Sequence, residues 1–267
     1  MSNPLASQRQ AVILDEVERL GAVRVSSLVA RLGVSDMTIR RDLDALAQRG
    51  LVIKVHGGAT SVGGRSVDEP GFEAKQVRAQ GEKDAIAHIA AEMVTPGSAV
   101  GISAGTTTWT LAHLLRDVPG LTVVTNSMRV ADVVLSGGRA DQTVVLTGGI
   151  RTPSDALVGP VAVEALRTLH LDQVFLGVHG MDERGFTTPN LMESETDRAL
   201  VEAGRQLVVV ADHSKWGVVG LATIVPLSDA DVLITDEALP PNAREVLGAQ
   251  VGELVIARTP VARAGER

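Results

Sequence analysis

The chain has 267 residues, no cysteine and a formal net charge of −7, with 45% hydrophobic but only 2% aromatic residues. This length fits one small domain and one of ordinary size, and the lack of cysteine excludes disulfides and thiolate chemistry. Cores without rings are filled by Ala, Val, Leu and Ile, which favours helices packed on buried parallel strands. The chain shows no signal-peptide pattern and no run near the roughly 20 apolar residues that span a bilayer, so we expect a cytoplasmic protein.

Charge is unevenly distributed along the chain. Residues 1–60 contain eight Lys and Arg against six Asp and Glu, a net of +2, whereas the remaining residues carry −9. A surplus of this size indicates nucleic-acid binding only when the basic groups gather on one surface. The positions of these groups on the predicted elements therefore decide what the surplus means.

Three short helices are predicted in the first fifty residues. The first begins at a cap on Ser7, and the second begins at Ser26 and ends at Gly33, which tolerates a left-handed turn. Ser35 is placed to cap the third helix. The apolar side of the third helix is made by Ile39, Leu43 and Leu46.

The short turn between the second and third helices is typical of a helix-turn-helix, which places the start of its second helix in the major groove of DNA. Hydroxyl and N–H groups at that start suit phosphate, and forked guanidinium groups pair with guanine edges or phosphate oxygens. A plain three-helix bundle with a solvated charged face is the alternative. The candidate DNA-binding residues here are Ser35, Met37, Thr38, Arg40 and Arg41.

An extended run follows the third helix. Residues 51–55 lose the helical period and are closed by two glycines, which predicts a hairpin. Lys54 and His56 are expected at its tip, where a basic hairpin follows backbone phosphates; an ordinary edge hairpin is the alternative. Residues 1–59 are therefore predicted to form a winged helix-turn-helix domain that binds double-stranded operator DNA.

A larger domain is predicted after a linker. Residues 60–74 are rich in Gly, Ser and Pro and form the expected linker. In residues 75–260, helical patterns alternate with short aliphatic runs that need both faces covered. This order predicts a doubly wound, mostly parallel α/β domain with its ligand crevice at the carboxyl ends of the strands. The predicted strands are 99–103, 121–125, 143–147, 173–177 and 206–211.

The loop after the first of these strands suits an anion. This anion loop, residues 103–108, runs directly into a helix. Gly105 lets the backbone approach a ligand, while N–H groups at the helix start and the hydroxyls of Thr106 and Thr107 supply donors. Phosphate is the predicted ligand, and simple capping of the helix by Thr106 is the alternative.

Further polar loops follow the other strands and are expected to converge with the anion loop. Basic side chains there offer charge to a phosphate, while amide and carboxyl groups offer hydrogen bonds to hydroxyls. Each residue taken alone is more often a cap or a turn, and the acidic residues after position 192 also suit the first turn of a helix. The candidates are Asn126, Arg151, Asp182, Glu193 and Lys215.

Two sets of motifs resemble one family. The run VSDMTIRRDLDALAQRGLVIKVHGGA resembles the N-terminal signature of the DeoR family of bacterial regulators, and SAGTTT, VVTNS, LTGGIR, FLGVHGMDERGFTTPN, ESETDRAL and ADHSK resemble its sensor domain. The resemblance implies a fold similar to that of sugar-phosphate isomerases and a response to phosphorylated sugars or their catabolites. Carried over by position, the effector residues are Ser103, Gly105, Thr106, Thr107, Asn126, Gly148, Arg151, Glu193 and Lys215.

We therefore expect a repressor of carbohydrate catabolism genes that acts as a homo-oligomer, dimer or tetramer, on repeated half-sites and needs no metal or cofactor. The alternative is a sugar-phosphate isomerase or deaminase with an appended DNA-binding domain. Where such deaminases carry Asp-Gly-His, residues 182–184 read Asp-Glu-Arg, so no catalytic residue is expected. A structural adaptor is a weaker alternative, because the exposed basic residues near position 40 lack large apolar neighbours.

Overall fold

A computed structural model divides the chain into two compact units, Met1–Pro70 and Gly71–Arg267. The boundary falls inside the predicted linker, and the end of that linker, residues 71–74, belongs to the larger unit. His56, predicted at the hairpin tip, lies outside the described residues. No helix in the described stretches is both long and apolar enough to cross a bilayer. The described residues are 6–20, 22–49, 51–55, 57–61, 71–137 and 139–259.

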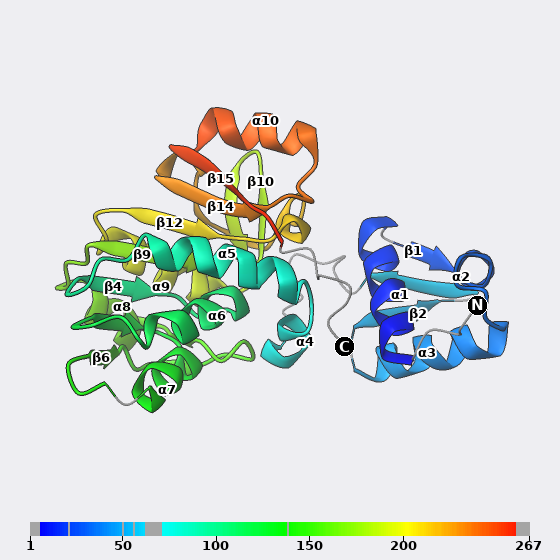
Figure 1. The fold of residues 1–267 in the computed structure, drawn as a ribbon, viewed down its shortest axis with the longest axis horizontal. Coiled ribbons are helices and arrows are strands. Elements are labelled where there is room, and N and C mark those ends of the chain that lie inside the picture. The colour runs from blue at the N-terminus through cyan, green and yellow to red at the C-terminus, as the bar shows by residue number, and fades with distance from the viewer. Residues whose placement is uncertain are drawn as a thin grey trace, which may run out of the picture. The chain divides into compact units, whose positions relative to one another are not determined.

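The smaller unit combines helices with a small antiparallel sheet (Figure 1). Its described elements are α1 (Ala6–Leu20), β1 (Ala22–Arg24), α2 (Val25–Leu32), α3 (Asp36–Gln48), β2 (Val52–Val55) and β3 (Gly58–Ser61). The sheet has the order β1-β3-β2, so the predicted hairpin is present. Strand β1, which the sequence pattern did not predict, pairs with the hairpin and completes the sheet of a winged helix-turn-helix.

The turn of the helix-turn-helix has the predicted geometry. Gly33 closes α2 with a φ of +64°, in the left-handed region, and the Ser35 hydroxyl caps α3 by accepting a backbone N–H bond of 3.2 Å. The first two helix starts were predicted wrongly, because α1 and α2 each begin one residue before the expected caps, Ser7 and Ser26. The chain enters α2 directly from β1, which leaves no capping turn between them.

A buried ion pair joins the first and third helices of the smaller unit. Arg9 on α1 donates from Nη2 to Oδ1 of Asp42 on α3 at 3.1 Å, and only 10% and 5% of the two side chains are exposed. The apolar side of α3 packs beside it, since Ile39, Leu43 and Leu46 are at most 1% exposed. The opposite side of α3 is therefore fixed toward solvent.

The larger unit is built on a parallel sheet of seven strands. The strand order is β15-β14-β12-β9-β4-β5-β6, and every neighbouring pair is parallel. All five predicted strands are confirmed, and two more, β14 and β15, extend one end of the sheet. The strands are β4 (Ala99–Ile102), β5 (Thr122–Thr125), β6 (Thr143–Leu146), β9 (Gln173–Gly177), β12 (Leu207–Val210), β14 (Val232–Asp236) and β15 (Glu253–Ala257).

Helices cover both faces of this sheet, as the aliphatic runs predicted (Figure 1). Along β12, Leu207 and Val209 pack in one core with α8, α9 and α10, while Val208 and Val210 pack in the other core with α5, α6 and α7. The doubly wound arrangement is confirmed. The helices are α5 (Gln80–Glu92), α6 (Thr106–Leu115), α7 (Met128–Ser136), α8 (Pro160–Leu166), α9 (Leu191–Glu202) and α10 (Pro241–Gln250).

The order of the strands reverses between β4 and β9. From β4 the chain moves outward through β5 to β6, and from β9 it moves the other way through β12 and β14 to β15. The loops that follow β4 and β9 therefore diverge, and such a switch point is where doubly wound sheets bind ligands.

Smaller elements lie around the sheet and were not predicted. They include a short helix, α4, ahead of the main sheet and two small antiparallel sheets, β7–β8 and β10–β11–β13. Their bounds are α4 (Phe72–Gln76), β7 (Ile150–Arg151), β8 (Leu157–Val158), β10 (Gly180–Asp182), β11 (Gly185–Thr188) and β13 (Ala222–Val225).

Candidate functional site

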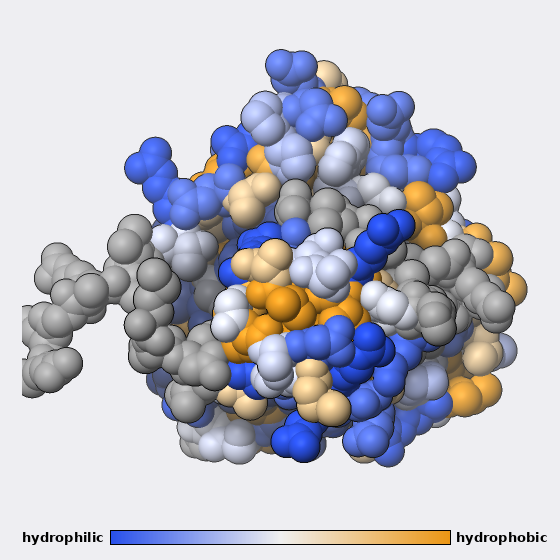
Figure 2. All heavy atoms as spheres, turned by 90° about the vertical axis from the view of Figure 1, so that its right-hand side faces the viewer, coloured by the Kyte–Doolittle hydropathy of each residue, from blue (hydrophilic) through white to orange (hydrophobic). Residues whose placement is uncertain are grey.

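The exposed side of α3 is the candidate DNA-binding surface. Met37 is 71% exposed, and Arg41 is exposed without a hydrogen bond or ion pair to any described residue. The hydroxyls of Ser35 and Thr38 lie 2.8 Å apart at the helix start. Seen from the side where α2 and α3 lie in Figure 1, hydrophilic side chains surround a smaller hydrophobic area (Figure 2). The structure thus groups four of the predicted residues at one end of one helix.

The other two described candidates of the smaller unit are paired within it. Arg40 forms an ion pair with Asp36 one turn earlier on α3, and Lys54 forms one with Asp44. Lys54 lies within β2, opposite Ala59. The prediction had placed it at the hairpin tip. Both ion pairs are exposed, where such pairs contribute little to stability and exchange readily with other partners.

A polar cavity lies at the carboxyl ends of the central strands of the larger unit. It takes residues from the loops after β4, β5, β9 and β12 and from the helices α4 and α9. The position is the switch point of the sheet, so the predicted convergence of loops occurs. Six of the predicted effector residues line the cavity: Gly105, Thr106, Thr107, Asn126, Glu193 and Lys215.

The anion loop meets the cavity with the start of α6. Gly105 is the residue before the helix and Thr106 is its first residue, so no side chain caps the N–H groups of the first turn. A Cβ on Gly105 would lie 3.0 Å from Thr108 Oγ1, so the close turn favours glycine. Asn126 Oδ1 accepts the N–H of Ala104 at 2.8 Å and fixes the loop. Uncapped donors at a helix start form an anion site.

Ser103 supports this loop from below. Its side chain is fully buried, and its hydroxyl accepts the N–H of Gly177 at 2.9 Å, which joins the loops after β4 and β9. Ser103 does not line the cavity. In the structure Ser103 therefore stabilises the loops around the cavity and does not face a ligand bound there.

The loop after β12 brings Lys215 to the cavity. His213 Nδ1 lies 2.8 Å from Asp236 Oδ1, and this hydrogen bond raises the pKa of the imidazole. Burial opposes ionisation of Asp236, but the hydrogen bonds from His213 outweigh burial and lower the pKa of the carboxyl. Asp212 accepts the N–H of Ser214 at 3.1 Å. These bonds fix the turn, while the Lys215 ammonium has no partner among the described residues.

Two carboxyl groups on α9 face the cavity one helical turn apart. Glu193 Oε1 accepts the hydroxyl of Thr152 at 2.9 Å and also that of Ser154, and Oε2 accepts the hydroxyl of Thr188 at 2.9 Å. Asp197 is 8% exposed, and burial together with the charge of Glu193 raises the pKa of its carboxyl well above the ordinary range. The cavity therefore combines anion-binding donors with a buried acidic pair.

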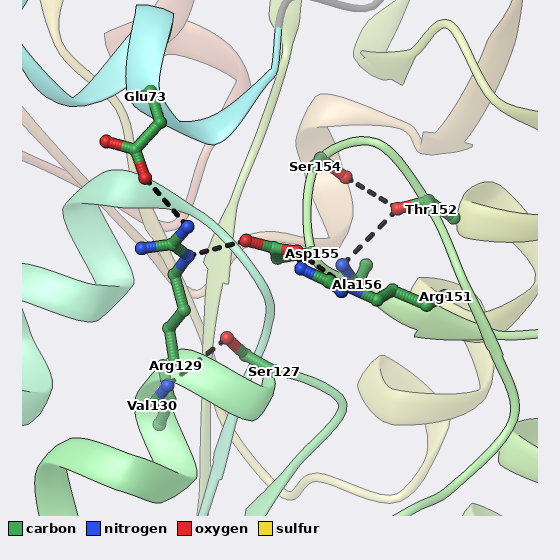
Figure 3. A network of polar contacts seen from close by, with 9 residues as sticks. All are labelled: Glu73, Ser127, Arg129, Val130, Arg151, Thr152, Ser154, Asp155 and Ala156. Atoms are coloured by element: carbon green, nitrogen blue, oxygen red, sulfur yellow. Dashed lines mark hydrogen bonds and ion pairs between the residues drawn. The ribbon is translucent and has the colours of Figure 1, made fainter.

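Arg129 fastens the short helix α4 to the wall of the cavity. Its guanidinium donates to Glu73 at 2.8 Å and to Asp155 at 2.6 Å (Figure 3). It also stacks 4.1 Å from the centre of the Phe72 ring. Phe72 also meets the ring of Trp109 edge-on at 5.8 Å. Burial opposes ionisation of Asp155, but the hydrogen bonds from Arg129 and from the neighbouring arginine lower the pKa of the carboxyl.

Besides Ser103, three predicted effector residues do not line the cavity. Arg151 is exposed and pairs with Asp155, and Asp182 pairs with Arg184 at 2.7 Å in the β10–β11 hairpin. Gly148, with a φ of +72°, lies in the turn after β6. Arg151 and Asp182 are thus both engaged in ion pairs within the protein. Their positions in the sequence did not show that they lie outside the cavity lining.

Several lining residues were missed by sequence reasoning. Asp197 lies four residues after Glu193, and this helical spacing could have revealed it. Lys75 is the first residue of the predicted α/β domain, and no pattern marked it. The missed polar residues are Lys75, Ser154, His179, Thr188 and Asp197.

Comparison with known proteins identifies both units. The family described as "DeoR-like helix-turn-helix domain" matches residues 9–64, and "DeoR C terminal sensor domain" matches residues 78–237. Among solved structures, ribose 5-phosphate isomerase A from Neisseria gonorrhoeae has a TM-score of 0.38 at 17% identity, covering 50% of this chain and 52% of that one. The eIF2B beta subunit from Chaetomium thermophilum has a TM-score of 0.44 at 13% identity, covering 87% and 78%.

Curated relatives match almost end to end. The HTH-type transcriptional regulator YgbI of Escherichia coli K12 is 39% identical over 94% of this chain and 98% of its own length. The glycerol-3-phosphate regulon repressor of the same organism is 33% identical over 90% and 95%. The regulator GlpR of Haloferax volcanii is 38% identical over 90% and 94%. With both of its units matched, the chain belongs to the DeoR family of transcriptional regulators.

Proposed function

We propose that this regulator is a cytoplasmic repressor that binds operator DNA through α3 and the β2–β3 hairpin, and that a phosphorylated sugar or related metabolite in the cavity controls this binding. The observation that carries the proposal is the cavity at the switch point of the sheet, where an uncapped helix start lies near basic side chains. The genes it represses are proposed to serve carbohydrate catabolism, in keeping with relatives named for a glycerol-3-phosphate regulon and an aga operon.

Support for DNA binding comes from the charges on α3. Arg41 has its five guanidinium donors free of described partners, and a guanidinium pairs with guanine or phosphate through two hydrogen bonds. Arg40 and Lys54 are held only by exposed ion pairs, which phosphate can replace. We propose that Arg41 reads a base edge and that Arg40 and Lys54, with His56, contact the backbone.

Support for a phosphorylated effector comes from the donors of the cavity. The first-turn N–H groups of α6, the hydroxyls of Thr106 and Thr107 and the ammonium of Lys215 all favour an anion. Lys75 adds a second ammonium from α4. A dianionic phosphate satisfies these groups better than a neutral sugar does, because each donor gains a charged acceptor.

Helix α4 offers a path from the cavity to the DNA-binding unit. Phe72 and Lys75 line the cavity, and α4 begins directly after residues 62–70, which join the units in sequence. We propose that an occupied cavity repositions α4 and thereby the chain leading to the smaller unit. Changing DNA occupancy from about 99% to about 1% requires the effector to prefer one state by about 5.5 kcal/mol, which several phosphate contacts can supply.

We propose that the protein acts as a homo-oligomer, dimer or tetramer. With a net charge of only +2 on residues 1–60, a single DNA-binding unit should bind DNA weakly. Two linked units that bind repeated half-sites together should bind more tightly than one. We also propose that the cavity is not catalytic. Three protein hydroxyls donate to Glu193, so both of its carboxylate oxygens are already engaged within the protein.

The test is a thermal-shift screen of phosphorylated sugars on the full chain, followed by gel shifts on the DNA upstream of its own gene with each compound that binds. The proposal predicts that at least one compound raises the Tm and changes the DNA affinity. Neutral sugars serve as the control. Failure to bind any such DNA at low ionic strength would contradict the repressor function, and turnover of a bound compound would favour a sugar-phosphate isomerase or deaminase.

A further inference from the structure

Asp197 is a buried acidic residue that faces the cavity without a partner. Only 8% of the residue is exposed, and its carboxyl belongs to the cavity lining. No described residue forms a hydrogen bond or ion pair with it. Buried polar groups in proteins are nearly always hydrogen-bonded, and a buried carboxyl without a partner lowers stability.

Other buried carboxyl groups of the larger unit are satisfied. Asp155 is bonded by Arg129 and Arg151, and Asp236 by the side chain and the N–H of His213. Glu193, one turn before Asp197, accepts three hydroxyls. Asp197 therefore differs from these carboxyl groups because no described residue forms a hydrogen bond or ion pair with it.

The arrangement assigns different roles to the two carboxyl groups of α9. The hydroxyls of Thr152, Ser154 and Thr188 fix Glu193 from two separate segments of the chain. Burial, together with the charge of Glu193, raises the pKa of Asp197 and so favours the neutral form of its carboxyl. A neutral carboxyl both donates and accepts a hydrogen bond. An alcohol hydroxyl also does both, so the two groups match.

We propose that Asp197 is a specificity-determining residue of the cavity and binds a hydroxyl group that the effector carries in addition to its phosphate. This inference rests on the proposed function, because it assumes that the anion loop takes the phosphate. The effector class is then a phosphorylated polyol or sugar, and phosphorylated compounds without hydroxyls are expected to bind more weakly because they leave the carboxyl unmatched. The charge of Glu193 adds to burial in favouring the neutral form of Asp197.

The experiment compares pairs of phosphates that differ only in hydroxyls. By calorimetry, the full chain is titrated with n-propyl phosphate and glycerol 3-phosphate, and with n-pentyl phosphate and ribitol 5-phosphate. We expect the wild type to bind the hydroxylated member of at least one pair about tenfold or more tightly, since losing a matched buried hydrogen bond costs about that factor. In Asp197→Ala this preference should fall to about threefold or less, with alkyl phosphate binding unchanged.

Two further variants keep the result interpretable. Asp197→Asn preserves the volume of the side chain and its ability to donate and accept hydrogen bonds, so it replaces Asp197→Ala if that variant does not fold. Its preference for hydroxylated phosphates should lie between those of the wild type and Asp197→Ala. Glu195→Gln alters an exposed carboxyl on the same helix and should leave both affinities as in the wild type.

The outcomes separate this inference from the proposed function. A wild-type preference that survives in Asp197→Ala would overturn the role of Asp197 and leave the phosphate site intact. Equal binding of both members of each pair by the wild type would do the same. If none of the phosphates bound the wild type, the proposed function itself would fail, and the inference with it.

Discussion

The two units present their charged groups in opposite ways. On the smaller unit the described basic groups of α3 and the hairpin are exposed: Arg40 and Lys54 are held in exposed ion pairs, and Arg41 has no described partner. In the larger unit the functional charges lie in a cavity, where hydrogen bonds from several loops fix them. DNA is a large polyanion that meets an open surface, whereas a small effector must be enclosed to be recognised. Substitutions of the exposed basic groups should therefore change stability little, whereas substitutions of the buried groups around the cavity should change it more.

The largest change in stability is expected from breaking the buried ion pair of Arg9 and Asp42, which joins α1 to α3 in the smaller unit. Asp42→Ala leaves Arg9 buried without its carboxylate, and we expect a loss of about 3 kcal/mol in the free energy of unfolding of this unit. Urea denaturation followed by circular dichroism measures it. Asp36→Ala removes an exposed partner and should change stability by less than about 0.5 kcal/mol. Equal effects of the two variants would refute the distinction between buried and exposed pairs.

The next effect separates two neighbouring arginines. Arg41→Ala should weaken operator binding roughly tenfold, because it removes the guanidinium, without a described partner, that we propose pairs with a base edge. Arg40→Ala should weaken it less, since Arg40 must first leave Asp36. Fluorescence anisotropy with labelled upstream DNA measures both. Binding of phosphorylated sugars should be unchanged in each variant; a loss of both functions in a folded Arg41→Ala protein would argue against independent sites.

Two carboxyl groups near the cavity should respond to pH with opposite signs. The pKa of Asp155 is lowered, so its stabilising contribution is present above its unfolded value of about 3.9 and is lost as the pH falls through the folded pKa. The pKa of Asp197 is raised, so stability is lost as the pH rises above about 3.9. Asp155→Asn should thus lower the free energy of unfolding most near pH 7, whereas Asp197→Asn should raise that of the effector-free chain most at the same pH. Denaturation from pH 4 to pH 7 tests this, and parallel pH profiles would contradict it.

The smallest effect concerns the turn of the helix-turn-helix. Gly33 has a φ of +64° and open space around its Cα, so Gly33→Ala should cost about 1 kcal/mol through backbone conformation alone. Gly33→Asn should cost less, because asparagine tolerates this conformation. Thermal unfolding measures both changes. A cost well above that of the Asp42 variant would mean that the turn, and not the buried pair, dominates the stability of the smaller unit.

Much of the fold was predictable because its signals are local. The buried aliphatic runs of β4, β5, β9 and β12 marked a sheet covered on both faces, and Gly33 and Ser35 marked the helix-turn-helix. Strands β14 and β15 were missed although both are short aliphatic runs, so burial does not explain the omission: β14 is fully buried, and the exposed edge strand β6 was predicted. The small antiparallel sheets are too short to show a period.

The site was predictable only where it follows strand ends. Thr106, Asn126 and Lys215 come directly after parallel strands, so sequence order placed them at one edge of the sheet. The i,i+4 spacing of Asp36 and Arg40 could have separated Arg40 from Arg41. Nothing in the sequence distinguishes Glu193 from Asp197, because the hydroxyls that bind Glu193 come from distant segments. Those contacts decide which group is free to meet a ligand.

Control of the DNA-binding unit by the cavity should appear as a change in DNA affinity when the effector binds. The affinity for labelled upstream DNA is measured by fluorescence anisotropy with and without a saturating phosphorylated sugar, at one ionic strength, for the wild type and for Lys215→Ala. We predict a change of about tenfold or more in the wild-type Kd, within the usual range of coupling between sites, and a smaller change in the variant at the same sugar concentration. A sugar phosphate that raises the Tm of the wild type but leaves its DNA affinity unchanged would contradict the account.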